Sequence, residues 1–75
     1  MILPGEVSQI ILSQLPDAKV EVRDLTGGGD HFEIVVVSKA FAGKTLLEQH
    51  KMVFAALEPE MDHRIHAVQL KTRTP

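Results

Sequence analysis

The side chains best suited to bind a metal ion in this chain are its four histidines, since the sequence contains no cysteine. These histidines are His31, His50, His63 and His66. The sequence has no HExxH motif, so it does not predict a self-contained zinc site. Without a thiolate of its own, the chain could take part in an iron–sulfur centre only if a partner supplied cysteine ligands.

Two of these histidines have an ordinary structural explanation when only their neighbours are considered. His66 lies in a predicted strand, on the same face as Val68 and Leu70. A partly buried imidazole bonded to the backbone is expected there. His50 lies in the apolar stripe of a predicted helix, where packing is expected rather than metal binding. Both histidines could therefore serve the fold without binding a metal.

A glycine-rich segment, residues 26–30, separates two predicted strands and is expected to form the loop of a hairpin. It lacks the P-loop pattern and a following helix, so nucleotide binding is not predicted. His31 comes directly after this loop and is either an exposed loop-end residue or a metal ligand. His63, next to Asp62, is expected to be solvated. The sequence has no Ser-His-Asp arrangement or carboxylate pair, and we expect a protein that is not an enzyme.

Hydrophobic spacing predicts three elements in the first half of the chain. Residues 4–15 have apolar side chains at helical spacing, with Pro4 in the first turn and Pro16 beyond the end. Residues 19–25 alternate between apolar and charged side chains, which is typical of a half-buried strand. Residues 32–37 are almost continuously apolar, which favours a strand in the middle of a sheet.

The second half of the chain predicts a short turn, a longer helix and a last strand. Ser38 is expected to cap a turn over residues 39–41, and residues 45–48 have the pattern of a capping box that opens a helix. A helical turn near Pro59 then precedes a strand over residues 64–72. We expect the longer helix to turn the following side chains inward: Leu46, Leu47, His50, Val53, Phe54 and Leu57.

These elements predict one domain over residues 1–75, in the order helix, strand, strand, helix, short helix, strand. A helical connection between the second and third strands allows a right-handed crossover. These two strands should therefore be parallel, with the helices on one face of the sheet. The expected fold is α+β, a two-layer αββααβ sandwich whose three-stranded mixed sheet has the second strand in the centre.

Three spaced motifs in the second half of the chain resemble the signature of the BolA family. Residues 41–44 match a phenylalanine-any-glycine-lysine turn, residues 50–51 match a histidine-basic pair, and residues 66–68 match a His-Ala-hydrophobic triplet. The resemblance implies a fold similar to the class II KH domain, and this agrees with the predicted order of elements.

The same resemblance implies a role in iron–sulfur chemistry. In BolA-like proteins the histidine of the triplet, matched here by His66, is the candidate iron ligand in a mixed complex with a monothiol glutaredoxin. A second ligand lies near the glycine loop, where His31 is the residue that matches. The resemblance thus implies an accessory protein that helps to bind, transfer or sense a two-iron two-sulfur cluster. Glutaredoxin and glutathione would share the cluster, which the isolated chain is not expected to hold.

The alternative is a regulator of transcription or cell morphology that binds DNA with a KH-like fold. The sequence has no GxxG loop and a net charge of −2. DNA binding is therefore expected to be weak and to decline steeply with salt. The residues expected to form a partner or nucleic-acid surface are Phe41, Gly43, Lys44, His50, Lys51, Lys71 and Arg73.

The composition is that of an ordinary globular protein. Hydrophobic residues make up 44% and charged residues 24% of the 75 residues, so neither a disordered nor a membrane-spanning chain is expected. The first residues lack the basic region and long apolar run of a signal peptide. With the absence of cysteine, this makes the cytoplasm the expected location. The sequence leaves open whether the free protein forms a homodimer.

Overall fold

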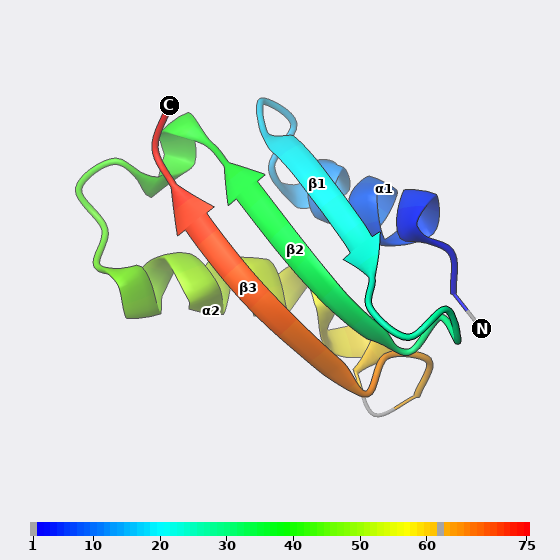
Figure 1. Cartoon of the computed structure of the whole chain (residues 1–75). Helices are drawn as coiled ribbons and strands as arrows, with labels where there is room; N and C mark the ends of the chain where they lie inside the picture. Colours follow the sequence, from blue (N-terminus) through cyan, green and yellow to red (C-terminus); the bar gives the residue numbers. More distant parts are fainter. Residues whose placement is uncertain (1, 62) are drawn as a thin grey trace.

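The computed structural model describes residues 2–61 and 63–75, and its elements follow the predicted order (Figure 1). The hairpin of the first two strands comes early in the chain, and a helical connection leads back to the last strand. The elements are α1 (Pro4–Gln14), β1 (Lys19–Asp24), β2 (His31–Val37), the short 3-10 helix η1 (Lys39–Phe41), α2 (Leu46–Leu57), the 3-10 helix η2 (Glu58–Glu60) and β3 (Ala67–Arg73).

The three strands form one mixed sheet with β2 in the centre. β2 pairs with β1 in antiparallel and with β3 in parallel orientation, so that Ile34 lies opposite both Val22 and Leu70. This confirms the predicted central strand and the predicted parallel third strand. The parallel pairing brings the first residues of β2 and β3 to the same end of the sheet.

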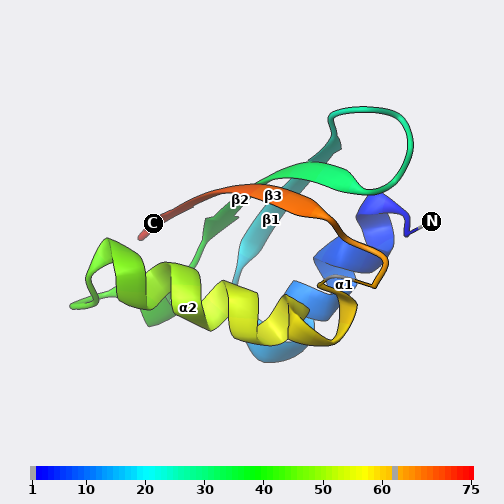
Figure 2. The ribbon, with the colours of Figure 1, turned by 90° about the horizontal axis from the view of Figure 1, so that it is seen from below.

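Both long helices cover the same face of the sheet, and the other face stays open (Figure 2). Alternate residues of β2 point toward the helices, and Phe32, Ile34 and Val36 are fully buried. Val35 and Val37 lie on the open face and are half-buried. The nearly continuous apolar sequence of β2 therefore reflects its central position in the sheet, with helices on one side only.

The predicted caps are present at η1 and α2. The hydroxyl of Ser38 accepts a hydrogen bond from the Ala40 N–H at 3.1 Å. The hydroxyl of Thr45 accepts from the Glu48 N–H at 3.1 Å, and the Glu48 carboxylate accepts from the Thr45 N–H at 2.9 Å. The backbone N–H and the hydroxyl of Thr45 hold the pKa of Glu48 below its usual value. These local contacts determine where each helix begins.

Helix α2 turns fewer apolar side chains toward the sheet than its sequence predicts. Val53 and Leu57 are fully buried, whereas Leu46 and Leu47 are 60% and 64% exposed. The prediction that these two leucines point inward is wrong. Both leucines belong to the first turn of α2. This end of the helix lies beyond the edge strand β3, so the sheet does not cover it (Figure 1). Within the described residues, no helix is long and apolar enough to cross a membrane.

Candidate functional site

The two histidines that the family resemblance selects lie together at one end of the sheet. Their ring centroids are 6.3 Å apart, and the ring planes are nearly perpendicular, at 79°. The parallel register explains this, because His31 is the first residue of β2 and pairs with Ala67, the residue after His66. Metal–imidazole bonds are about 2.0–2.1 Å long, so two rings on one metal ion have centroids roughly 5 Å apart. Small side-chain rotations would bring this pair to that spacing.

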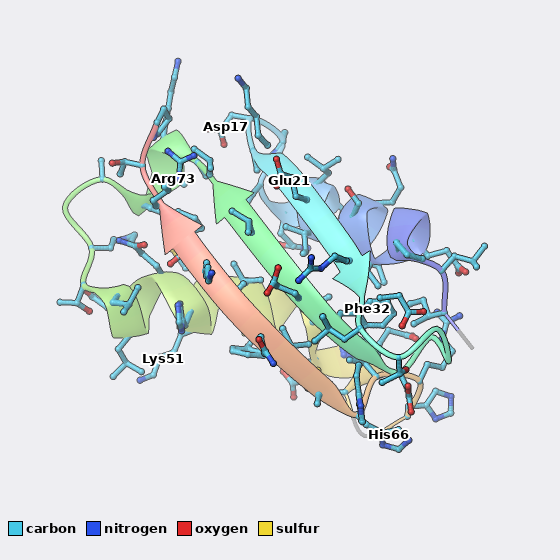
Figure 3. The ribbon with its side chains drawn as sticks, in the orientation of Figure 1. Asp17, Glu21, Phe32, Lys51, His66 and Arg73 are labelled. Atoms are coloured by element: carbon cyan, nitrogen blue, oxygen red, sulfur yellow. The ribbon has the colours of Figure 1, made fainter. Side chains whose placement is uncertain are left out.

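Both imidazoles are accessible from outside the domain. The side chain of His31 is 44% exposed, and His66 is exposed at the corner labelled in Figure 3. The nearest carboxylate oxygen of Asp30 lies 4.0 Å from His31 Nε2, beyond hydrogen-bond distance. A ligand carried by another molecule can therefore approach both rings.

The backbone holds the two histidines in fixed relation to each other. The carbonyl oxygen of Asp30 accepts hydrogen bonds from the His66 N–H at 2.8 Å and the Ala67 N–H at 3.2 Å. On the other side, the carbonyl oxygen of His31 accepts from the Leu25 N–H at 2.9 Å. The site is therefore the junction at which the hairpin loop and the start of β3 meet.

Asp24 organises the glycine loop that leads to His31. Its Oδ1 accepts from the Thr26 N–H at 3.2 Å and the Gly27 N–H at 2.9 Å, and its Oδ2 accepts from the Gly29 N–H at 2.9 Å. Gly27 and Gly29 have φ angles of 76° and 72°, a conformation that other residues rarely adopt. The sequence analysis missed this role of Asp24. The signal was present, because an aspartate two to three residues before a glycine turn often bonds the backbone that follows it.

Replacing Asp24 with alanine is expected to loosen this loop and to lower the free energy of unfolding by about 2 kcal/mol, since three N–H groups lose their acceptor. Urea denaturation measures the loss, and amide hydrogen exchange at residues 26–31 locates it. Asp24→Asn keeps one carbonyl oxygen and should lose less. Glu21→Ala, an exposed change on the same strand, is the control. If Asp24→Ala were no more destabilised than this control, the loop would not depend on Asp24.

The segment that ends at His66 is fixed by buried and charged contacts. The side chain of Ile65 is fully buried, and its N–H donates to the carbonyl oxygen of Glu60 at 2.9 Å. The guanidinium of Arg64 donates to the Glu60 carboxylate and lies 3.4 Å from the Glu6 carboxylate on α1. The hydrogen bond between Arg64 and Glu60 lowers the pKa of the Glu60 carboxyl group and raises the pKa of the Arg64 guanidinium. His66 thus follows a segment anchored to the helical layer.

The structural explanation for His66 that its neighbours suggested is wrong. β3 begins at Ala67, later than the predicted residue 64, and Val68 and Leu70 face the helices without His66. His66 lies just before the strand and is exposed. A partly buried strand histidine would have bonded within the fold, whereas this imidazole faces outward.

The other two histidines lie away from the pair. His50 is half-buried in α2, and its Nε2 is buried with no hydrogen-bond partner among the described residues. His63 is exposed, and its neighbour Asp62 lies outside the described residues. Within residues 2–61 and 63–75, no three histidine, aspartate or glutamate side chains are placed to hold a metal ion together. The pair His31 and His66 therefore provides part of a ligand set.

The remaining residues of the predicted partner surface do not form one patch. Phe41 is buried in the core, and Gly43 has a φ angle of 75° in the turn before α2. Lys44 and Lys51 are exposed on the helical layer (Lys51 in Figure 3). The side chains of Lys71 and Arg73 are exposed on the open face of the sheet, on the opposite side. The basic residues thus divide between two surfaces.

The fold and the site define a small two-layer α+β domain with two accessible imidazoles at one end of its sheet. A family model described as BolA-like protein matches residues 11–75. The chain belongs to the BolA-like protein family.

Its similarity to individual proteins extends over the whole chain. Protein BOLA2 of Arabidopsis thaliana is 47% identical over 77 residues, which cover 100% of this chain and 82% of that protein. A BolA protein homologue from Coxiella burnetii is 37% identical, with a TM-score of 0.85 over 100% of this chain and 94% of the other. The BolA domain of SufE1 from Arabidopsis thaliana is 27% identical, with a TM-score of 0.86 over 96% of this chain and 91% of the other.

Proposed function

We propose that this domain is an accessory protein that partners a monothiol glutaredoxin in the binding, transfer or sensing of a two-iron two-sulfur cluster. The observation that carries this proposal is the proximity of His31 and His66, whose rings lie 6.3 Å apart at an exposed end of the sheet. A further support is that a BolA domain also occurs in a SufE-like protein of Arabidopsis thaliana, which points to iron–sulfur biology.

The donor set of the chain fits a shared cluster better than one held alone. Two imidazoles can replace two thiolates on one iron, as they do in Rieske centres. In this proposal His66 is the first iron ligand and His31 the second. The remaining ligands are thiolates, one from a cysteine of the glutaredoxin and one from glutathione, because this chain has no cysteine. The domain's own part is to present two imidazoles on a rigid backbone, which is a binding role rather than a catalytic one.

Mixing the purified domain with a cluster-loaded monothiol glutaredoxin and glutathione tests this function. Visible absorption and circular dichroism of the mixture should differ from the sum of the separate components, as imidazole replaces thiolate on iron. The domain incubated alone with iron and sulfide should hold no stable cluster. A mixture whose spectra equal that sum at every protein ratio would contradict the proposal.

A further inference from the structure

The charged side chains on the open face of the sheet are distributed unevenly along the strands. The register places Lys19, Val37 and Arg73 in one row across β1, β2 and β3. The next row contains Glu21, Val35 and Lys71. The row closer to the histidines pairs Arg23 with Glu33, whose charged groups lie 3.2 Å apart. Positive charge therefore collects where β2 and β3 end, while the middle of the face is balanced.

A hollow of about 470 Å³ lies at this basic end of the sheet, lined by Asp17, Lys19, Val37, Lys39, Arg73 and Pro75. Its position is opposite to the histidine pair, as the labels Asp17, Arg73 and His66 show in Figure 3. Three cationic side chains and one carboxylate line it. Among the described residues, none of these three cations makes an ion pair. The hollow therefore carries an excess of positive charge that the fold does not use.

Asp17, the acidic side chain that lines the hollow, has a structural role. Asp17 Oδ2 accepts from the Lys39 N–H at 2.8 Å, and Asp17 Oδ1 accepts from the Ser38 hydroxyl at 2.8 Å. These two bonds, the backbone one first, lower the pKa of Asp17. They tie the connection before β1 to the turn after β2. Both carboxylate oxygens of Asp17 are thus bonded to the turn after β2. The side chains of Lys19, Lys39 and Arg73 remain available to an anion from another molecule.

We propose that this basic hollow binds an acidic, extended segment of a protein partner. Lys19 and Arg73 lie two strand spacings apart, roughly 10 Å, which three to four extended residues span. Arginine and lysine bond carboxylates strongly, and arginine can hold both oxygens of one carboxylate. The half-buried Val35 and Val37 provide an apolar floor for an aliphatic side chain of the segment.

The composition of this face favours an acidic peptide over a nucleic acid. Single strands bind by stacking their bases on aromatic side chains. Among the described residues, the open face beside the hollow carries no phenylalanine, because Phe32 and Phe41 are buried in the core and Phe54 belongs to α2.

The basic hollow and the histidine pair can be occupied at the same time. Val37 lies six positions after His31 on β2, which corresponds to roughly 20 Å along the strand. The domain could thus contact one protein through the cluster and a second through the hollow. This inference does not depend on the proposed cluster function, since no contact of the hollow involves either histidine.

Titration of the ¹⁵N-labelled domain with a blocked peptide of sequence EELEDE, followed by NMR at low salt, tests the proposal. Addition of the peptide should change the amide chemical shifts mainly at Lys19, Val37, Lys39 and Arg73, and should leave that of His31 unchanged. Charge reversal of both flanking cations, Lys19→Glu with Arg73→Glu, should weaken binding roughly tenfold or more. Lys44→Glu with Lys51→Glu makes the same change of net charge on the helical layer. This variant is the matched control and should lower the affinity far less.

Three results would overturn the proposal. The first is an absence of peptide shifts at millimolar concentration. The second is a loss of affinity in Lys44→Glu with Lys51→Glu equal to that in Lys19→Glu with Arg73→Glu, which would mean that only net charge matters. The third is tighter binding of an oligothymidylate of equal charge at the same residues, which would make this end a nucleic-acid surface. The variant with Lys19→Glu and Arg73→Glu must keep the amide spectrum of a folded domain. If it does not, Arg73→Gln alone replaces it in the affinity measurement.

Discussion

Replacement of His66 with alanine is expected to abolish the spectral change that the domain causes in a cluster-loaded monothiol glutaredoxin. The imidazole of His66 is exposed before β3 and is the first of the two proposed iron ligands. Its loss leaves iron under-coordinated, so the cluster should remain in its original thiolate environment. His31→Ala removes the second proposed ligand and should give a mixed complex whose cluster is labile. Visible circular dichroism of the mixtures measures both effects.

His63→Ala is the matched control for this experiment. It removes the same kind of side chain from the same connecting segment, three residues before His66, and His63 is exposed too. The variant should behave as the unmodified domain does. Far-ultraviolet circular dichroism must show that each variant is folded. A folded His66→Ala variant that still produces the full spectral change would mean that His66 is not an iron ligand.

The order of elements was predictable from the sequence because local chemistry determines most of it. The capping box of Thr45 and Glu48 fixes the start of α2 through contacts between residues three apart. The alternation of β1 predicted a half-buried strand, and the continuous apolar sequence of β2 predicted a central strand, as observed. Such signals depend on neighbours in the sequence, which a single chain displays directly.

Features that depend on how distant elements meet were harder to predict. Leu46 and Leu47 fit the apolar stripe of α2, yet they are exposed, because the first turn of this helix lies beyond the edge of the sheet. The start of β3 depends on the Asp30 carbonyl, which receives the N–H groups of His66 and Ala67 from a segment more than 30 residues away in the chain. The proximity of the two histidines follows from that parallel register. The sequence alone selected the pair only through its resemblance to a family.

The basic hollow was also hard to predict from the sequence, because residues far apart in the chain form it. Lys19 and Arg73 are 54 positions apart in the chain and come to lie in one row, on either side of Val37, only through the two pairings of β2. The sequence analysis grouped Lys44 and Lys51 with Lys71 and Arg73 in one expected surface around the second helix and the end of the last strand. In the fold, side chains of a strand alternate between faces, and this alternation assigned Lys71 and Arg73 to the open face.

Replacement of Phe32 with alanine is expected to lower the free energy of unfolding by about 3–5 kcal/mol, the range for removal of a buried phenylalanine ring. Phe32 is fully buried, lies opposite Asp24 on β1 and Val68 on β3, and directly follows His31. A domain of this length is typically stable by roughly 4–11 kcal/mol, so this loss removes a large part of the total stability. Urea denaturation followed by circular dichroism measures the loss.

Two further variants separate the effect of burial from that of the strand itself. Phe32→Leu keeps much of the apolar volume and should lose clearly less stability than Phe32→Ala. Val35→Ala lies on the same strand but on the open, half-buried face, and should cost about 1 kcal/mol or less. Because Phe32 is the first inward residue of β2, its ring supports the end of the sheet that holds His31. Phe32→Ala should therefore also weaken the mixed complex, but in proportion to its unfolded fraction, whereas His66→Ala should do so in a fully folded domain. Equal losses of stability in Phe32→Ala and Val35→Ala would contradict the assignment of Phe32 to the core.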